Sequence, residues 1–336
     1  MDEKKPLPEH SVMSQQPDQF PFPKILPFVW GAAYGLVLRL LFSGHVFVGM
    51  KLPGAMTTAF AVVVPIVIGA ITVYMAERKA RRSILFYIFA PWLSVTLFVA
   101  GTAIALIEGS ICIAMAMPLF LLLGSFGGLV MGVVCRLRNN PIRTVQSIAI
   151  LPFLFALHEG GHPLPESTHK IIRSVHIASS PEVVWKNIAS PTNIKPSELE
   201  GGLAYAIGVP YPVEAHLLAA GRGGIRHSVW QHGVSFDEKI TSWDEYHHMT
   251  WQYRFDANSF PPGSMDEHVV IGGEYFDLNE TTYTLSPETG GTRLDIAITY
   301  RVSTGFNWYA IPMAKLFISS TADALLNLYK NRAEAT

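Results

Sequence analysis

The feature that most constrains this chain is a series of long apolar runs in its first half. Each run approaches or exceeds the ~20 residues that an α-helix needs to cross ~30 Å of hydrocarbon. Over the whole chain, hydrophobic residues make up 49% and charged residues only 15%, whereas soluble domains carry about 25% charged residues. A membrane-embedded helical region is therefore expected over residues 25–157. Its four long runs cover 25–43, 55–76, 84–107 and 111–135.

Glycines and prolines inside these runs favour the same interpretation. Gly124, Gly128 and Gly132 recur every fourth residue, which is the spacing that lets membrane helices approach closely. The interior prolines of the runs would disturb helices of a soluble protein, but they are tolerated in membrane helices. Residues 1–24 are polar and rich in proline, and are expected to form a disordered arm.

Positive charges predict the orientation of the helical region. Arg and Lys cluster at 78–82, between the second and third runs, and again at 136–143, while the opposite loops hold only Lys51 and Glu108. Because basic loops stay in the cytoplasm, the amino terminus and both basic segments are expected there. With the family resemblance given below, this places the chain in a bacterial inner (plasma) membrane.

A fifth apolar segment, Val145–Leu157, leaves two alternatives open. Its 13 or so residues favour an interfacial or re-entrant segment, but a short tilted helix can still cross a locally thinned bilayer. The domain that follows would be cytoplasmic in the first case and extracytoplasmic in the second, which we marginally prefer.

The second half changes to the periodicity of a soluble α+β domain. After a Gly/Pro-rich linker at 158–168, alternation over 170–178 predicts a strand, and Ser180-Pro181-Glu182 is typical of a helix start. Both cysteines, Cys112 and Cys135, precede this domain, so it must be stable without disulfides. Further strands are expected at 213–219, 224–232, 234–243, 247–256, 268–285 and 292–303, followed by a long helix at 306–332.

This order of elements resembles the START-like helix-grip fold of the SRPBCC (polyketide cyclase/dehydrase) superfamily over residues 170–332. The opening strand and helix, His176-Ile-Ala-Ser-Ser-Pro-Glu-Val-Val-Trp185, are similar to those of the superfamily. The helical first half also resembles a bacterial membrane-anchored subgroup. Other segments similar to this subgroup are Gly208-Val-Pro-Tyr-Pro212, Gly224-Ile-Arg226, Gly233–Trp243, Met265-Asp-Glu267, Gly273-Glu-Tyr275, and Gly291-Thr-Arg-Leu294 with Tyr300.

The resemblance implies a sheet wrapped on the last helix, with an apolar cavity between them that binds a lipid or another hydrophobic small molecule. Arg226 and Glu238 lie on neighbouring predicted strands, where they can pair across the ladder, either facing the cavity or as a surface pair. Most of the aromatic residues are expected to be core. The candidate cavity residues are Trp185, Arg226, Trp230, Glu238, Trp243, Trp251, Tyr275 and Tyr300.

The segment His158-Glu159-Gly-Gly-His162 matches the H-E-x-x-H zinc signature. We reject a metal site there because the two glycines and Pro163 disfavour a continuing helix. No third ligand is evident in the sequence either. The segment is instead expected to be part of the linker.

Three functions follow from these observations. The leading one is a noncatalytic membrane-anchored module that binds a hydrophobic ligand, with no cofactor and with the lipid bilayer as its surroundings. The alternative is a cyclase- or dehydratase-type enzyme on the same fold, using cavity histidines or the Arg226/Glu238 pair. A zinc metallopeptidase is third. The net charge of −1 argues against a nucleic-acid partner, and the sequence names no protein partner.

Overall fold

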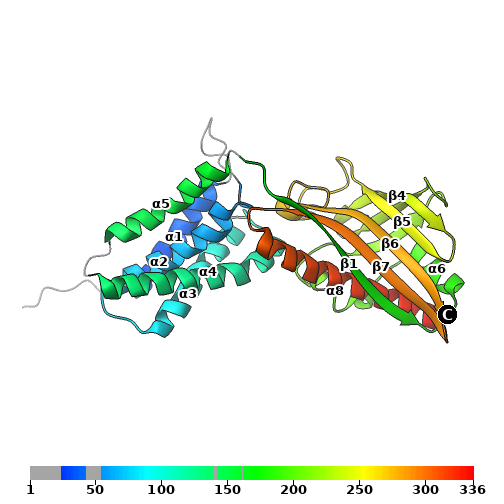
Figure 1. Ribbon diagram of the computed structural model, residues 1–336, viewed down its shortest axis with the longest axis horizontal. Helices are drawn as coiled ribbons and strands as arrows, with labels where there is room; N and C mark the ends of the chain where they lie inside the picture. Colours follow the sequence, from blue (N-terminus) through cyan, green and yellow to red (C-terminus); the bar gives the residue numbers. More distant parts are fainter. Residues whose placement is uncertain (1–23, 43–53, 139–141, 161) are drawn as a thin grey trace, which may run out of the picture.

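The computed structural model describes residues 24–42, 54–138, 142–160 and 162–336. Lys51 and all but the last residue of the expected arm at 1–24 lie outside them. A helical bundle and a curved sheet follow one another along the long axis of the molecule (Figure 1). The bundle consists of α1 (Leu26–Leu41), a π-helical turn η1 (Ala59–Val63) leading into α2 (Val64–Glu77), α3 (Ile84–Ile104), α4 (Ser110–Leu137) and α5 (Ile142–Glu159).

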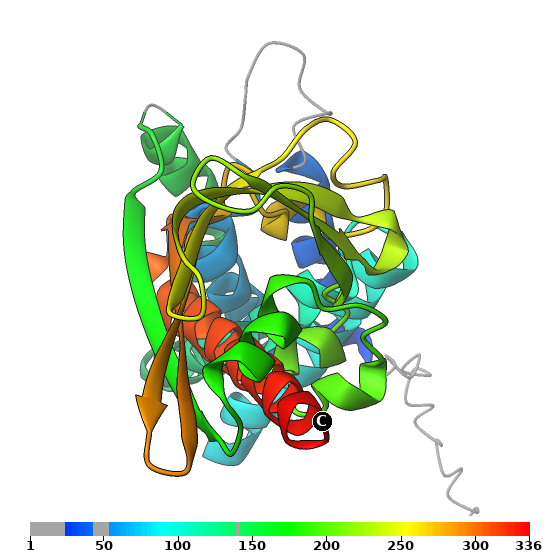
Figure 2. The same ribbon diagram turned by 90° about the vertical axis from the view of Figure 1, so that its right-hand side faces the viewer.

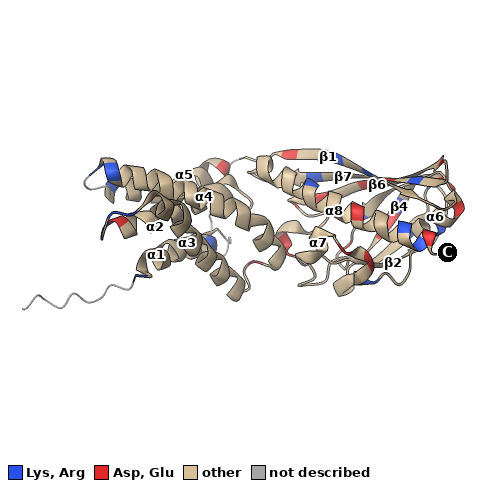
Figure 3. Cartoon of the chain, turned by 90° about the horizontal axis from the view of Figure 1, so that it is seen from below, with Lys and Arg blue, Asp and Glu red and all other residues tan. Residues whose placement is uncertain are grey.

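Among the described residues, three helices are long and apolar enough to cross a membrane: Ala59–Glu77, Ile84–Ile104 and Ser110–Leu137. α1 is a shorter apolar helix of 16 residues. The predicted glycine contact is present, since a Cβ atom added at Gly69 would overlap the backbone of Gly124. α2 and α4 therefore pack backbone to backbone. Lys and Arg are concentrated at the end of the bundle that lies away from the sheet (Figure 3).

α5 is longer than the expected segment at 145–157. It comprises 18 residues, which corresponds to about 27 Å at 1.5 Å per residue. It packs against α2 and η1, and its backbone oxygen at Ala149 accepts a hydrogen bond of 2.7 Å from Tyr34. The helix continues through His158 and Glu159, so it includes the first two residues of the expected linker.

The second half contains seven antiparallel strands in the order β1-β7-β6-β5-β4-β3-β2. Figure 2 shows this sheet curving around the last helix, α8 (Asn307–Glu334). The predicted α+β helix-grip arrangement is confirmed. The strands are β1 (Glu166–Ile177), β2 (Pro212–Leu217), β3 (Ile225–Trp230), β4 (Ser235–Asp244), β5 (His248–Arg254), β6 (Phe276–Glu288) and β7 (Gly291–Ser303).

Two boundaries differ from expectation. β1 begins at Glu166 instead of 170, because its first residues already pair with the end of β7, Glu166 opposite Ser303. The strand expected at 268–285 begins only at Phe276. A 3-10 turn at Glu267–Val269 and the positive φ of Gly272 (+78°) interrupt the extended chain before it, and glycine alone adopts such a φ without strain.

Short helices complete the domain: α6 (Pro181–Ala189) at the far end of the sheet, a 3-10 turn η2 (Pro196–Leu199), and α7 (Leu203–Ala206), which lies toward the bundle (Figure 3). α8 packs across β1 and β7. Ile240, Met249, Leu294 and Leu326 are almost completely buried in the core between sheet and helices.

Hydrogen bonds join the two halves directly. The Tyr309 hydroxyl of α8 donates to the Met115 carbonyl of α4 at 2.7 Å. The backbone of Gly305 exchanges two bonds with the start of η1, to Met56 and Thr58. On the opposite side, the Cys112 amide donates to Asp266 at 2.8 Å. The domain therefore sits directly on one end of the bundle.

Candidate functional site

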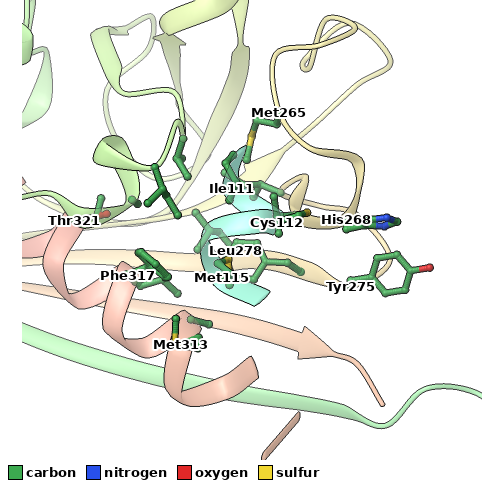
Figure 4. A pocket seen from close by; sticks show the side chains of 18 of the residues that line it. Ile111, Cys112, Met115, Met265, His268, Tyr275, Leu278, Met313, Phe317 and Thr321 are labelled. Atoms are coloured by element: carbon green, nitrogen blue, oxygen red, sulfur yellow. The ribbon is translucent and has the colours of Figure 1, made fainter. Parts of the chain in front are cut away.

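A cavity of about 290 Å³ lies where the sheet, α8 and the end of the bundle meet. Figure 4 shows Met313, Phe317 and Thr321 of α8 on one side of it, with residues of α4 facing them. Most of the lining side chains are aliphatic or aromatic. The α4 residues labelled in Figure 4 are Ile111, Cys112 and Met115.

Arg226 and Glu238 form a buried pair in the wall of this cavity. They face each other across β3 and β4, with exposed fractions of 5% and 4%, so the inward alternative holds. The other guanidinium nitrogens of Arg226 donate to the carbonyls of Ala189 and Ile188 at 3.0 and 3.3 Å, and its guanidinium lies 5.1 Å from the Trp251 ring centre. All three nitrogens are thus used inside the protein.

Burial and ion pairing shift the pKa values of Arg226 and Glu238 in opposite directions. Burial raises the pKa of the Glu238 carboxyl above its ordinary value, and the adjacent Arg226 guanidinium offsets part of this rise. For Arg226, burial by itself lowers the pKa, but the negative charge of Glu238 raises it above its ordinary value. Because the two side chains compensate each other, the pair presents no net charge to the cavity.

Tyrosines surround the pair on the cavity side. Burial raises the pKa of Tyr253, Tyr283 and Tyr329, so these phenols stay neutral and act as hydrogen-bonding groups. The Tyr253 hydroxyl bonds Thr281 at 2.7 Å and the Tyr283 hydroxyl donates to Tyr329 at 3.3 Å.

One tyrosine in the lining has no such partner. The Tyr205 hydroxyl is buried, and it makes no hydrogen bond to any residue that the structure describes. The indole N–H of Trp251, also in the lining, makes no hydrogen bond of acceptable geometry within the same residues, but it interacts with the Tyr253 hydroxyl. Buried polar groups are nearly always hydrogen-bonded, so the Tyr205 hydroxyl is the group that can bond a ligand.

A second polar group lies at the junction with the bundle. Arg39, in the last turn of α1, donates to Glu108 at 2.6 Å, and the side chains are 6% and 14% exposed. The His268 ring lies 4.0 Å from the same carboxylate. Arg39 was not among the sequence candidates, and His268 was considered only among the histidines that could act as general bases. A charged residue within an apolar run marks a functional position, and this signal could have identified Arg39.

Five of the eight sequence candidates line the cavity: Arg226, Trp230, Glu238, Trp251 and Tyr275. Three do not. Trp185 and Trp243 pack on each other with ring centres 4.9 Å apart, and Tyr300, 1% exposed, packs against Phe276. These three rings fill the space between elements of the core, which is the ordinary place for large aromatic side chains.

Glu159 has a structural role in the H-E-x-x-H segment. Its carboxylate accepts hydrogen bonds from the amides of Thr58 and Ala59 at 2.9 and 2.8 Å, and so caps the free N–H groups at the start of η1 and α2. The rings of His158 and His162 are 5.5 Å apart. Within the described residues, no three His, Cys, Asp or Glu side chains are grouped to hold a metal.

Comparisons with known proteins identify neither a family nor a curated relative: no family model and no curated protein matches the chain. Solved structures with some similarity include Ara h 8.0201 (10% identity, 51% of this chain and 100% of that one, TM-score 0.29). TTHA0849 from Thermus thermophilus is 18% identical over 50% and 98% of the two chains, with a TM-score of 0.31. The di-domain ARO/CYC BexL from the BE-7585A biosynthetic pathway is 15% identical over 64% and 63%, with a TM-score of 0.32. Similarity at this level supports no conclusion about activity.

Proposed function

We propose that this chain is a membrane-anchored START-like module that binds a hydrophobic small molecule or lipid between its sheet and α8. The observation that carries the proposal is the cavity itself. It combines apolar walls with a charge-compensated Arg226–Glu238 pair and the Tyr205 hydroxyl, which has no hydrogen-bond partner in the described part of the chain. An apolar pocket with few, fixed polar groups is the usual form of a small-molecule site.

Native mass spectrometry of the detergent-purified full chain tests this proposal. We expect a lipid adduct to co-purify with the wild-type protein. In Thr321→Trp the indole fills the cavity, so the adduct should be about tenfold less abundant, which corresponds to a loss of about 1.4 kcal/mol in binding free energy. The matched control is Leu316→Trp on the same helix, whose side chain is half exposed and outside the lining. An adduct of equal abundance in wild type and Thr321→Trp would contradict the proposal.

We further propose that the helix-grip domain lies on the extracytoplasmic side of a bacterial inner membrane, with the amino terminus in the cytoplasm. α5 supports this orientation, since its end at Glu159 meets the start of η1. α2 runs from that same end to Glu77 and the basic loop at 78–82. The domain and the basic loop are therefore at opposite ends of the bundle, and basic loops face the cytoplasm.

Cysteine labelling of intact cells tests the orientation. In a cysteine-free background made by Cys112→Ala and Cys135→Ser, a membrane-impermeant maleimide should label Thr289→Cys in the β6–β7 turn. It should not label Arg81→Cys until the membrane is permeabilised. The reverse pattern would place the domain in the cytoplasm.

An enzyme on the same fold is the second candidate, and one observation favours it. His268 and Glu108 both line the cavity with 4.0 Å between them, and histidine can act as a general base near neutral pH. Glu108 is, however, held by Arg39. If a reaction occurs, purified His268→Ala should retain the substrate, whereas the wild-type protein should carry the product. The two bound molecules would then differ in mass by the atoms gained or lost in the reaction, such as one water. Identical bound molecules argue for binding alone.

A further inference from the structure

The cavity does not end at the sheet. Its lining continues into the bundle through α4, from Ile111 to Phe120, and through Phe98 and Thr102 of α3. Phe60 of η1 completes this part of the wall, and its ring lies 6.4 Å from that of Phe98 and 6.5 Å from that of Phe120. The ends of three bundle helices therefore form an aromatic wall opposite the polar groups of the sheet.

The bundle wall is held in place relative to the sheet. Tyr309, whose hydroxyl bonds the Met115 carbonyl, lines the cavity itself. Asp266 and Ser110 bond across the junction on the other side, to the Cys112 amide and the Ile207 carbonyl. A ligand in the cavity thus contacts both halves of the chain at once.

The buried arginines of the lining are paired within the protein. Arg226 is compensated by Glu238 and Arg39 by Glu108. Glu214 also belongs to the lining, but its side chain is 37% exposed to solvent. Among the described lining residues, no Lys or Arg is left to neutralise a charged headgroup, and moving a charge into an apolar site without a partner is very costly. Tyr205, by contrast, offers a donor that no described residue satisfies to a neutral oxygen.

We propose that the bundle forms one half of the ligand site, and that the ligand is a neutral membrane lipid with one oxygen function, such as a long-chain alcohol or ester. Its oxygen lies near Tyr205. Its hydrocarbon chain lies against α3, α4 and η1, and α3 and α4 also expose much of their apolar surface on the outside of the bundle. This inference rests on the proposed function and adds to it the class of ligand and the part played by the helices.

Photolabelling of the full chain in phosphatidylcholine nanodiscs tests both parts. The probes are hexadecanol with a diazirine in its chain and the phosphate monoester of the same alcohol. We expect the alcohol to label at least about tenfold more protein, a difference of about 1.4 kcal/mol. The labelled peptides should include residues 111–120 of α4. Equal or stronger labelling by the phosphate ester would overturn the neutral-lipid assignment.

Two alanines of α4 provide a matched pair of variants. Ala116 lines the cavity, whereas Ala114, two positions earlier on the helix, does not. Ala116→Trp should reduce labelling by the alcohol about tenfold, and Ala114→Trp should leave it within about twofold. Since a variant can fail to fold, the labelled peptides of the wild-type protein give an independent result.

The outcomes separate this inference from the proposed function. If the alcohol labels only the sheet and α8, and Ala116→Trp has no effect while Thr321→Trp abolishes labelling, the bundle contributes nothing and the inference is wrong. The proposed function then still holds. If neither probe labels the wild-type protein and no lipid co-purifies with it, both are wrong.

Discussion

Tyr205 contributes a buried polar group to the lining of the cavity. Its hydroxyl is removed from water, and burial raises its pKa far above the ordinary range, so it stays protonated. No described residue accepts or donates a bond to it. A buried polar group without a partner costs about 1–3 kcal/mol. Such a cost is offset in the complex if a ligand supplies the missing partner.

Replacing Tyr205 by phenylalanine should therefore stabilise the delipidated protein and weaken ligand binding. We expect Tyr205→Phe to raise the free energy of unfolding of the ligand-free chain by about 1 kcal/mol, and to lower its affinity for the alcohol probe about tenfold. Thermal unfolding in detergent and photolabelling measure the two effects. Tyr329→Phe is the control, because its hydroxyl accepts a bond from Tyr283 and its loss should destabilise. A destabilised Tyr205→Phe protein would mean that the hydroxyl has a partner after all.

The two ion pairs of the cavity differ in how far the sequence predicts them. Arg226 and Glu238 are twelve residues apart on adjacent strands, so a hairpin pattern already brings them opposite each other. Arg39 and Glu108 are separated by 69 residues, and only the packing of α1 beside α3 makes them neighbours. Local periodicity holds no information about that contact.

At the scale of elements, the end of α8 is attached to η2 by one well-formed ion pair. Arg332 contacts both carboxylate oxygens of Glu198, at 2.7 and 2.8 Å, and Glu198 also accepts a bond from the Lys195 amide at 2.8 Å. The hydrogen bonds from Arg332 lower the pKa of Glu198 below its ordinary value. Because the folded-state pKa is lowered, the stabilisation is present above the unfolded-state value of about 4.3 and is lost as the pH falls through the folded-state value.

Glu198→Gln should thus lower stability at neutral pH and matter little in acid. We expect a loss of about 1 kcal/mol in the free energy of unfolding at about pH 7, shrinking toward zero at about pH 3. Thermal unfolding of the full chain at both pH values measures it. The control is Glu200→Gln, an exposed residue with no ion pair among the described residues, which should have no effect at either pH. A loss that is the same at both pH values would show that packing, and not charge, is responsible.

Element positions were predicted well where one physical pattern dominates. Apolar length located the bundle helices, and alternation with turn glycines located most strands. α5 and β6 were placed less well. α5 continues past Leu157 because Glu159 bonds the start of η1, a contact 100 residues distant in sequence. β6 begins late because the preceding segment turns toward the bundle, where Asp266 bonds Cys112. Both differences arise from tertiary contacts that override local preference.

At the scale of the whole molecule, the helical half lines the cavity together with the sheet and α8. The sequence divides the chain into a membrane region, a linker and a binding domain, and predicts the cavity between sheet and α8 alone. The structure instead extends the cavity between both halves. Five candidate residues on the sheet side were identified from the resemblance and from aromatic content. The bundle side was missed because apolar residues of a membrane helix look the same whether they face lipid, a neighbouring helix or a ligand.

The domain nevertheless has a hydrophobic core of its own. The largest cluster of buried residues in this half runs from Ile171 to Ala333 without any residue of the bundle. Phe306 also packs against that cluster, and on its other side, together with Tyr309, against the apolar cluster of the bundle. A fragment without the bundle therefore keeps its core but exposes the open side of the cavity.

Residues 165–336, expressed alone, should fold cooperatively and bind the lipid poorly. We expect a single thermal transition by circular dichroism, because the core that supports two-state unfolding is retained. Affinity for the alcohol probe should fall at least about tenfold relative to the full chain, since the wall formed by Phe60, Phe98 and Phe120 is absent. The full chain carrying Thr321→Trp is the reference for lost binding. A fragment without a cooperative transition would contradict the domain boundary. A fragment that folds and binds as tightly as the full chain would show that the bundle is no more than an anchor.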